Sequence, residues 1–268
     1  MVSAPALKVS LDRKRYATGD TVVAHVNLAE GRRARGARVE LRYRNSWWMD
    51  QGVDTLSKSR TSDDIEVARV PLAEAIAGSL EAGERTARLT IPGDAPPSGP
   101  DIHWRVRAVI DLPLRPDLRA ERTLTVRSRA AQYEVLADAA DRPDPQLELD
   151  VARIAKVGET LSGRLTLSAR SDIEASEVRV DLTYADSLAP QGTRVARVLL
   201  AGHERFTVGE TRSFRFTLAL PAGGPPTTYA AKTTSRWHLT GTVARALAPD
   251  LSTRRELFVH NGPSIPEG

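Results

Sequence analysis

Short runs in which apolar and polar residues alternate recur along the chain. In the run from Ala37 to Arg44, the apolar residues Val39, Leu41 and Tyr43 alternate with charged ones. A period of two is typical of a β-strand that buries one face and exposes the other. The pattern therefore predicts a series of short strands in the first half, at residues 7–11, 21–28, 37–44, 65–70, 85–91, 104–111 and 122–126.

Polar segments separate these runs and predict the connections. The segment from Asp12 to Thr18 is expected to be a loop. The segment from Glu30 to Gly36 is polar with glycine towards both ends, and it is predicted to be a hairpin tip. Residues 71–80 differ, because their apolar residues follow helical spacing behind Pro71. One short helix is predicted there, with the proline in its first turn.

Two adjacent tryptophans, Trp47 and Trp48, lie in a stretch without clear periodicity, from Asn45 to Asp64. One interpretation is a β-bulge or strand end that places one ring inside the protein. The other is an exposed aromatic loop that contacts a ligand, a partner or a lipid surface. Asp63 and Asp64 are expected to lie in a polar loop of the same stretch, with no third ligand at a spacing that indicates a calcium site.

A 23-residue pattern occurs twice, from Trp104 to Val126 and from Trp237 to Val259. Each copy opens on tryptophan, reaches Pro-Asp-Leu twelve positions later and closes on Leu-x-Val. The other strand signals also repeat in the second half, so the chain is predicted to contain two homologous domains, 1–130 and 131–268. Short strands with regular turns and at most one short helix predict an all-β fold of two tandem immunoglobulin-like β-sandwiches. The repeated tryptophans are expected in the cores, and Asp117 and Asp250 in turns.

Composition narrows the class of protein. Cysteine is absent, which excludes disulfides and thiolate metal sites. The N-terminal segment has no apolar signal-peptide region and no run is long enough to span a membrane, so a cytoplasmic location is expected. The net charge is +4, and the positive excess lies in the first half. A basic face that meets an anionic partner is therefore expected in the first domain.

The order of these signals resembles the arrestin fold. The turn Tyr16-Ala17-Thr18-Gly19-Asp20 precedes a strand, a later strand ends at Pro92, and a Pro96-Pro97 loop leads into the Trp104 strand. The second half repeats this order through Pro221, Pro225-Pro226 and Trp237. The resemblance covers nearly the whole chain and is nearest to bacterial sporulation-control arrestin-like proteins, and more distant to eukaryotic arrestins and the arrestin-fold retromer subunit. It implies a scaffold that binds other proteins, and sometimes membranes, without chemistry.

The residues themselves indicate no catalytic site. The five histidines have no partners at zinc-ligand spacing, and no nucleophile elbow or phosphate-binding loop is present, so no cofactor, metal or enzymatic activity is expected. The expected function is that of a non-enzymatic adaptor or regulator, and the alternative is a carbohydrate- or lipid-binding β-sandwich protein. The candidate partner-binding residues are Arg32, Arg33, Arg35, Arg42, Arg44, Trp47 and Trp48.

The candidate residues favour another protein with an acidic surface as the partner. An anionic membrane surface is a second possible class of partner. Nucleic acid is not favoured, because the aromatic residues do not alternate with the arginines as a base-stacking surface requires.

Overall fold

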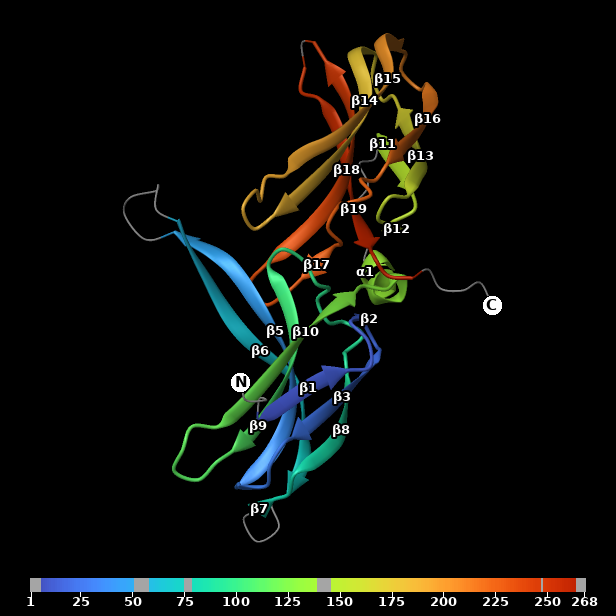
Figure 1. Ribbon diagram of the computed structural model, residues 1–268. Coiled ribbons are helices and arrows are strands. Elements are labelled where there is room, and N and C mark those ends of the chain that lie inside the picture. Colours follow the sequence, from blue (N-terminus) through green and yellow to red (C-terminus); the bar gives the residue numbers. More distant parts are fainter. Residues whose placement is uncertain (1–5, 51–57, 75–78, 139–145, 247, 264–268) are drawn as a thin grey trace. The chain divides into compact units, whose positions relative to one another are not determined.

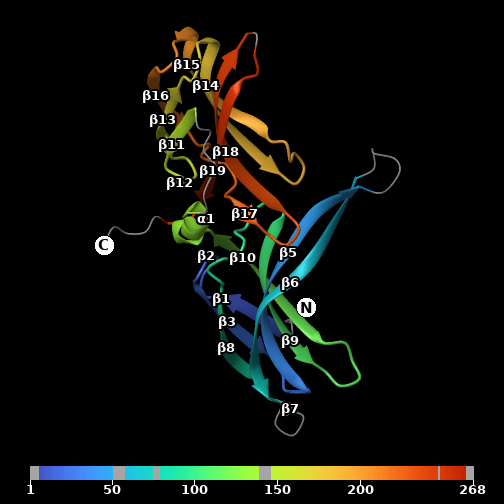
Figure 2. The same ribbon diagram turned by 180° about the vertical axis from the view of Figure 1, so that it is seen from behind.

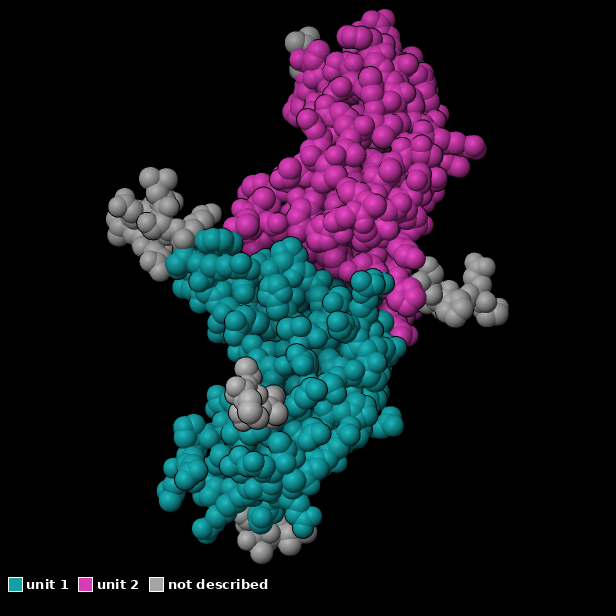
Figure 3. Space-filling view, viewed as in Figure 1, with its two compact units in different colours: residues 1–128, 230–232 teal, residues 129–229, 233–268 magenta. Residues whose placement is uncertain are grey.

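A computed structural model describes residues 6–50, 58–74, 79–138, 146–246 and 248–263. Of the described residues, 66% lie in strands and 3% in helices, which confirms the predicted all-β, sandwich-like fold. It divides into two compact units, which Figure 3 shows in different colours. The first unit is Met1–Ser128 with Ala230–Lys232, and the second is Arg129–Tyr229 with Thr233–Gly268. The domain boundary at residues 130 and 131 stays a prediction.

The first unit contains two sheets that carry its core, and their strands pair antiparallel except for β2 with β10 (Figure 1). The three-stranded sheet has the order β1-β3-β8 and consists of β1 (Leu7–Leu11), β3 (Thr21–Leu28) and β8 (Gly83–Thr90). The five-stranded sheet has the order β2-β10-β9-β5-β6 and consists of β2 (Arg15–Ala17), β10 (Leu118–Arg127), β9 (Ile102–Asp111), β5 (Gly36–Asp50) and β6 (Lys58–Glu74). A separate pair consists of β4 (Arg32–Arg33) and β7 (Ser79–Leu80).

The second unit has the same strand order (Figure 2). Its three-stranded sheet, β11-β13-β16, consists of β11 (Leu147–Val151), β13 (Thr160–Ser168) and β16 (Thr211–Ala219). Its six-stranded sheet runs β12-β19-β18-β14-β15, with β17 beside β18. These strands are β12 (Ile154–Lys156), β19 (Leu251–His260), β18 (Thr234–Arg245), β14 (Ile173–Asp186), β15 (Thr193–Phe206) and β17 (Thr228–Tyr229).

The turns of the two units also match. Gly19 and Gly158 have φ angles of 85° and 83°, which favour glycine, at the turn after the short strands β2 and β12. The next residue of each turn bonds back through its carboxylate: Asp20 Oδ2 accepts the Ala17 N–H at 2.9 Å, and Glu159 Oε2 accepts that of Lys156 at 2.6 Å. Both short strands pair in parallel with the last strand of their unit. The two halves that repeat in sequence therefore also form the same hydrogen bonds at this turn and the same parallel strand pairing.

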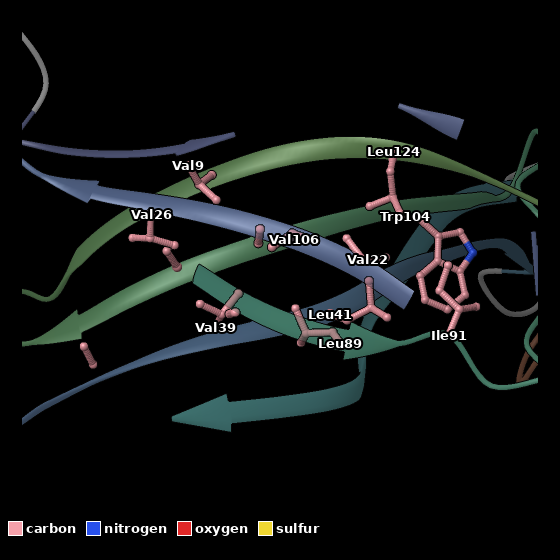
Figure 4. Packing of buried hydrophobic residues seen from close by; sticks show 14 of the residues in the cluster. Val9, Val22, Val26, Val39, Leu41, Leu89, Ile91, Trp104, Val106 and Leu124 are labelled. Atoms are coloured by element: carbon pink, nitrogen blue, oxygen red, sulfur yellow. The ribbon is translucent and has the colours of Figure 1, made fainter. Parts of the chain in front are cut away.

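Each core holds one of the repeated tryptophans. Trp104 and Trp237 are 1% and 2% exposed, which agrees with their predicted place in the cores. Each ring lies with its centroid 5.0 Å from a tyrosine ring of the neighbouring strand, Tyr43 or Tyr184. Each indole N–H donates to a carbonyl of a proline loop at 2.9 Å, Pro96 in the first unit and Pro225 in the second. In the first unit, Val and Leu side chains of both sheets fill the layer between them, with Trp104 and Ile91 at one end (Figure 4).

The predicted helix at residues 71–80 is wrong where the structure describes it. Pro71 to Glu74 continue β6, and Ser79–Leu80 form β7, while residues 75–78 lie outside the described part. Pro71 lies opposite Arg38 beside a register shift, and β6 is the last strand of its sheet. An edge strand accepts proline because no neighbour needs its missing N–H. The apolar spacing of residues 71–74 therefore did not indicate a helix.

The helices that the structure describes lie elsewhere. They are a 3₁₀ turn, η1 (Ala130–Tyr133), and one short α-helix, α1 (Glu134–Asp138), at the start of the second unit. Within the described ranges, no helix has the length and apolar character needed to cross a bilayer. The expected loop from Asp12 to Thr18 is also interrupted, because Arg15–Ala17 form β2.

Gly163 of β13 lies against the core, so a side chain there should be destabilising. A Cβ atom on Gly163 would lie 2.5 Å from the ring of Phe216 and 2.8 Å from the backbone oxygen of Asp150. Both neighbours are held by sheet pairing. We expect Gly163→Ala to lower the free energy of unfolding by about 1–3 kcal/mol, because the core must shift to admit the methyl group. Urea denaturation measures this loss.

The matched control is Gly202→Ala in strand β15, where no heavy atom lies within 4 Å of the added Cβ. We expect this variant to unfold within about 0.5 kcal/mol of the parent protein, as surface substitutions usually do. Equal losses in the two variants would contradict the close packing of β13 on β16.

Candidate functional site

The outer face of the five-stranded sheet carries the arginines predicted on strand β5. Val39, Leu41 and Tyr43 of β5 are buried in the core, as the alternation predicted, so Arg42 and Arg44 lie on the opposite face. Each of these two arginines forms ion pairs with carboxylates of the same sheet. The face is therefore a network of opposite charges, which we call the outer-face network, and the basic patch expected there is largely neutralised.

Glu40 is the buried centre of the outer-face network. Its carboxylate accepts from Arg38 Nε at 2.7 Å and from Arg42 Nη1 at 3.0 Å, while Arg69 Nη2 lies 3.9 Å away. The residue is 1% exposed. Burial alone would raise the pKa of Glu40, but the hydrogen bonds from Arg38 and Arg42 outweigh it and hold the pKa below the ordinary value of 4.5. The carboxylate therefore stays ionised and binds the two guanidinium groups together.

Asp64 is a second centre of the outer-face network. It lies in β6, so the polar loop predicted for Asp63 and Asp64 is wrong. Arg44 donates from Nε to Asp64 Oδ1 at 3.1 Å, and Arg105 of β9 forms a closer ion pair with the same carboxylate. Burial would raise the pKa of Asp64, but the two guanidinium groups lower it below 3.8. A carboxylate held by two arginines is unavailable as a cation ligand or a general base at neutral pH.

The other predicted arginines lie at the start of β5. Arg32 and Arg33 form β4, which pairs with β7, so the segment is not the hairpin tip that was expected. It is a passage from one sheet to the other, since β3 and β5 belong to different sheets. Arg32 pairs with Glu30 at 2.9 Å, and Arg33 is exposed.

Arg35 lines a shallow cavity of about 300 Å³ in the first unit. It forms an ion pair with Asp111 at 2.7 Å. Two further arginines of the lining are also paired: Arg38 with Glu40, and Arg69 with Glu66 at 2.8 Å. The guanidinium groups around this cavity are therefore already bound to carboxylates of the protein.

The two tryptophans lie at the far end of β5. Strand β9 pairs with β5 only as far as Asn45 opposite Ile102, whereas β6 pairs on to Asp50 opposite Lys58. Residues 46–50 and 58–62 therefore form a two-stranded extension of the sheet, which we call the β5–β6 ribbon, and Figures 1 and 2 both show it leaving the rest of the first unit. Both tryptophans lie in a strand rather than in a loop, but the ring expected inside the protein is not buried, since Trp47 is half-buried and Trp48 is exposed.

The side chains of the β5–β6 ribbon become more exposed along β5 from Ser46 to Met49. Trp47 is half-buried, and its ring centroid lies 5.8 Å from the ammonium group of Lys232, which belongs to the same unit. Trp48 is 43% exposed and the neighbouring Met49 is 49% exposed. Arg60 lies opposite Trp48 on β6, and its guanidinium is bound by Asp101 at 3.2 Å. The ribbon thus exposes Trp48 and Met49, one on each face, on a backbone that is fixed by pairing.

The predicted residues do not form one surface. Thirteen positions separate Arg35 from Trp48 along an extended chain, which corresponds to about 40 Å at the rise of a β-strand. Arg32, Arg33 and Arg35 therefore lie at one end of β5, Arg42 and Arg44 in the middle, and the tryptophans at the other end. Met49 as a site residue and the length of the ribbon were not predicted from the sequence. A strand end that is exposed on both faces has no alternation of apolar and polar residues to reveal it.

The described residues contain no group of three or more histidine and acidic side chains that could hold a metal ion. Among the histidines, His25 lies 3.3 Å from Glu84, and both side chains are exposed. No protein-family model matches the chain, and no curated protein is significantly similar to it in sequence. The function of the chain is therefore proposed from its own geometry and from the resemblance of its strand order to the arrestin fold.

Proposed function

We propose that this chain is a non-enzymatic adaptor or regulatory protein of the arrestin-like type, which binds another protein through the exposed side chains of the β5–β6 ribbon. The observation that carries the proposal is the exposure of Trp48 and Met49, consecutive strand residues that lie on opposite faces of a paired ribbon. Aromatic residues and methionine are enriched at protein interfaces, and a few such side chains supply most of the binding free energy. The cytoplasmic location and bacterial source that belong to this proposal follow from composition and resemblance alone.

The shape of the ribbon supports a contact with a protein surface. Its two strands pair through Met49 opposite Ser59, so the backbone is ordered before any partner binds. Binding by an ordered segment costs less conformational entropy than binding by a loop that must fold. Charge attraction contributes less to binding of a partner than the sequence suggested, because Arg42 and Arg44 form ion pairs within the sheet. An acidic partner region is therefore best matched at Arg33, near the other end of β5.

Replacing Trp48 and Met49 together with alanine should weaken partner binding by at least about tenfold, the effect of losing one interface hot spot. The measurement is affinity purification from the source organism, followed by a binding titration with each protein that the parent chain captures. Leu188→Ala is the matched control, since Leu188 is 53% exposed between β14 and β15, the strands of the second unit that correspond to β5 and β6. Unchanged binding by the Trp48–Met49 variant would contradict the proposal.

The alternative is a carbohydrate- or lipid-binding protein that uses the same tryptophan. It is favoured by Trp48 alone, because an exposed aromatic ring suits a sugar face or a membrane interface as well as a protein. Glycan arrays and vesicles with anionic lipid separate the two functions. Saturable binding to either, lost in the Trp48–Met49 variant and kept in Leu188→Ala, would replace the adaptor proposal by this alternative.

A further inference from the structure

The second unit has a cavity of about 380 Å³ on the outer face of its larger sheet. It is bordered by the end of β14, the turn that follows, and strands β18 and β19. Trp237 and Leu239 of β18 are buried in the core, so Arg236 and His238 lie on the opposite face of the sheet. Arg254 of β19 lies opposite Thr240, on that same face. Three basic side chains therefore converge on one cavity.

The two guanidinium groups of this cavity have no carboxylate within ion-pair distance in the described part of the chain. Arg236 contacts the ring of Tyr229, with its guanidinium carbon 5.5 Å from the ring centroid. One acidic residue, Asp186, also lines the cavity, and Glu256 lies beside His238 on the neighbouring strand; the carboxylates of both accept hydrogen bonds from other groups. Glu256 accepts the hydroxyl hydrogen of Tyr229 at 2.7 Å, and Asp186 accepts the backbone N–H groups of Leu188 and Ala189 at 2.9 Å.

His238 adds a second observation that points to a ligand. Its Nδ1 atom is buried and has no hydrogen-bond partner within the described residues. A buried polar atom without a partner is costly, and a bound ion is one way in which native proteins satisfy it. Burial, together with the charges of Arg254 and Arg236, lowers the pKa of His238, while Glu256 acts in the opposite direction. Burial is the largest of these causes, and the charge of Arg254 is the next.

The first unit supplies a comparison. Its cavity at Arg35 and Arg69 has a similar size, but those guanidinium groups are bound by Asp111 and Glu66. Arginine without a partner presents a planar set of N–H donors that matches a phosphate or carboxylate group, and hydrogen bonds between charged groups are the strongest that proteins make. The arginines of the second cavity keep that capacity.

We propose that the cavity formed by Arg236, His238 and Arg254 binds an oxyanion, with a phosphate group as the best match to two guanidinium groups and an imidazole. The site is distinct from the β5–β6 ribbon, and its ligand would be a small anion or an anionic group on a larger molecule. The failure of either proposal leaves the other in place, because the ribbon and the cavity belong to different units.

The test is a titration of the full chain with inorganic phosphate, followed by NMR of the histidine and arginine side chains at constant ionic strength. We expect saturable shifts of His238 and a rise in its pKa when phosphate binds, because an anion favours the charged imidazole. Arg236→Gln/Arg254→Gln should weaken phosphate binding by at least about tenfold, through the loss of two charge-assisted hydrogen bonds. The matched control, Arg35→Gln/Arg69→Gln, removes two exposed arginines from the first cavity and should bind phosphate like the parent.

Three results would overturn the proposal. They are a linear, non-saturable response of His238, an equal loss in the two double variants, and a His238 pKa that phosphate leaves unchanged. The last result is obtained on the parent protein, so it holds even if a variant fails to fold. Acetate and citrate titrations then distinguish the sources of the anion: preference for phosphate indicates a phosphorylated ligand, and equal affinity for citrate indicates a carboxylate.

Discussion

Trp104→Ala is expected to lower the free energy of unfolding by about 3–5 kcal/mol, the range for removing a buried aromatic side chain. The indole is 1% exposed, packs on Tyr43 and donates a hydrogen bond to the Pro96 carbonyl. Alanine removes the buried apolar area and leaves that carbonyl in the core without its donor. The measurement is urea denaturation followed by circular dichroism, with thermal unfolding as a second probe.

Variants at Trp237 and Trp48 show whether the loss is specific to the buried, repeated tryptophans. Trp237→Ala should cost about as much as Trp104→Ala, because Trp237 has the same ring distance to Tyr184 and the same bond to a proline carbonyl. Trp48→Ala should change stability by no more than about 0.5 kcal/mol, as expected for a surface residue. A cost for Trp48→Ala as large as that for Trp104→Ala would contradict the ribbon's exposure and the assignment of the repeated tryptophans to the cores.

Glu40→Gln should lower the free energy of unfolding by about 2–3 kcal/mol, because it leaves two partly buried arginines without their shared carboxylate. The arginines keep some contact with water, since the side chains of Arg38 and Arg42 are 32% and 19% exposed, and this moderates the loss. The control is Glu66→Gln, which breaks a more exposed pair with Arg69 and should cost no more than about 1 kcal/mol. Equal costs would show that the Glu40 network does not stabilise the sheet.

The pH dependence of the Glu40 variant gives an independent check. The folded protein holds the pKa of Glu40 below its unfolded value of 4.5, so its contribution is fully present above pH 4.5. It is lost as the pH falls through the folded pKa, because both states then bind the proton. The difference in stability between the parent and Glu40→Gln should therefore be constant near neutral pH and shrink in acid below about pH 4.5. A difference that grows in acid would contradict the ionised, arginine-bound carboxylate.

Much of the fold was predictable because strands with one buried face have a strong local signal. The alternation of Val39, Leu41 and Tyr43 with charged residues was confirmed, as was the burial of both repeated tryptophans. The errors arose where tertiary pairing decided the outcome. Pro71 and the apolar residues after it have helical spacing. Pro71 to Glu74 nevertheless form an edge strand, because they pair with the first residues of β5. Arg15–Ala17 form a strand only because β10 lies beside them.

The candidate site was less predictable, because it depends on which residues of distant strands become neighbours. The sequence shows the arginines of β5, but it does not show that Arg44 of β5 and Arg105 of β9 both form ion pairs with Asp64 of β6. Their alignment turns a predicted basic face into a network of paired charges. The same reasoning applies to the cavity of the second unit, since Arg236 and Arg254 belong to different strands and meet only through the pairing of β18 with β19.

Hydrogen–deuterium exchange, measured on the chain alone and with the purified partner that it captures, tests the central claim that the β5–β6 ribbon is the binding surface. The account predicts that the partner slows exchange in residues 46–49 and 59–62, and that Trp48→Ala/Met49→Ala abolishes this protection together with binding. Protection confined to other parts of the chain, with unchanged exchange in the ribbon, would contradict it.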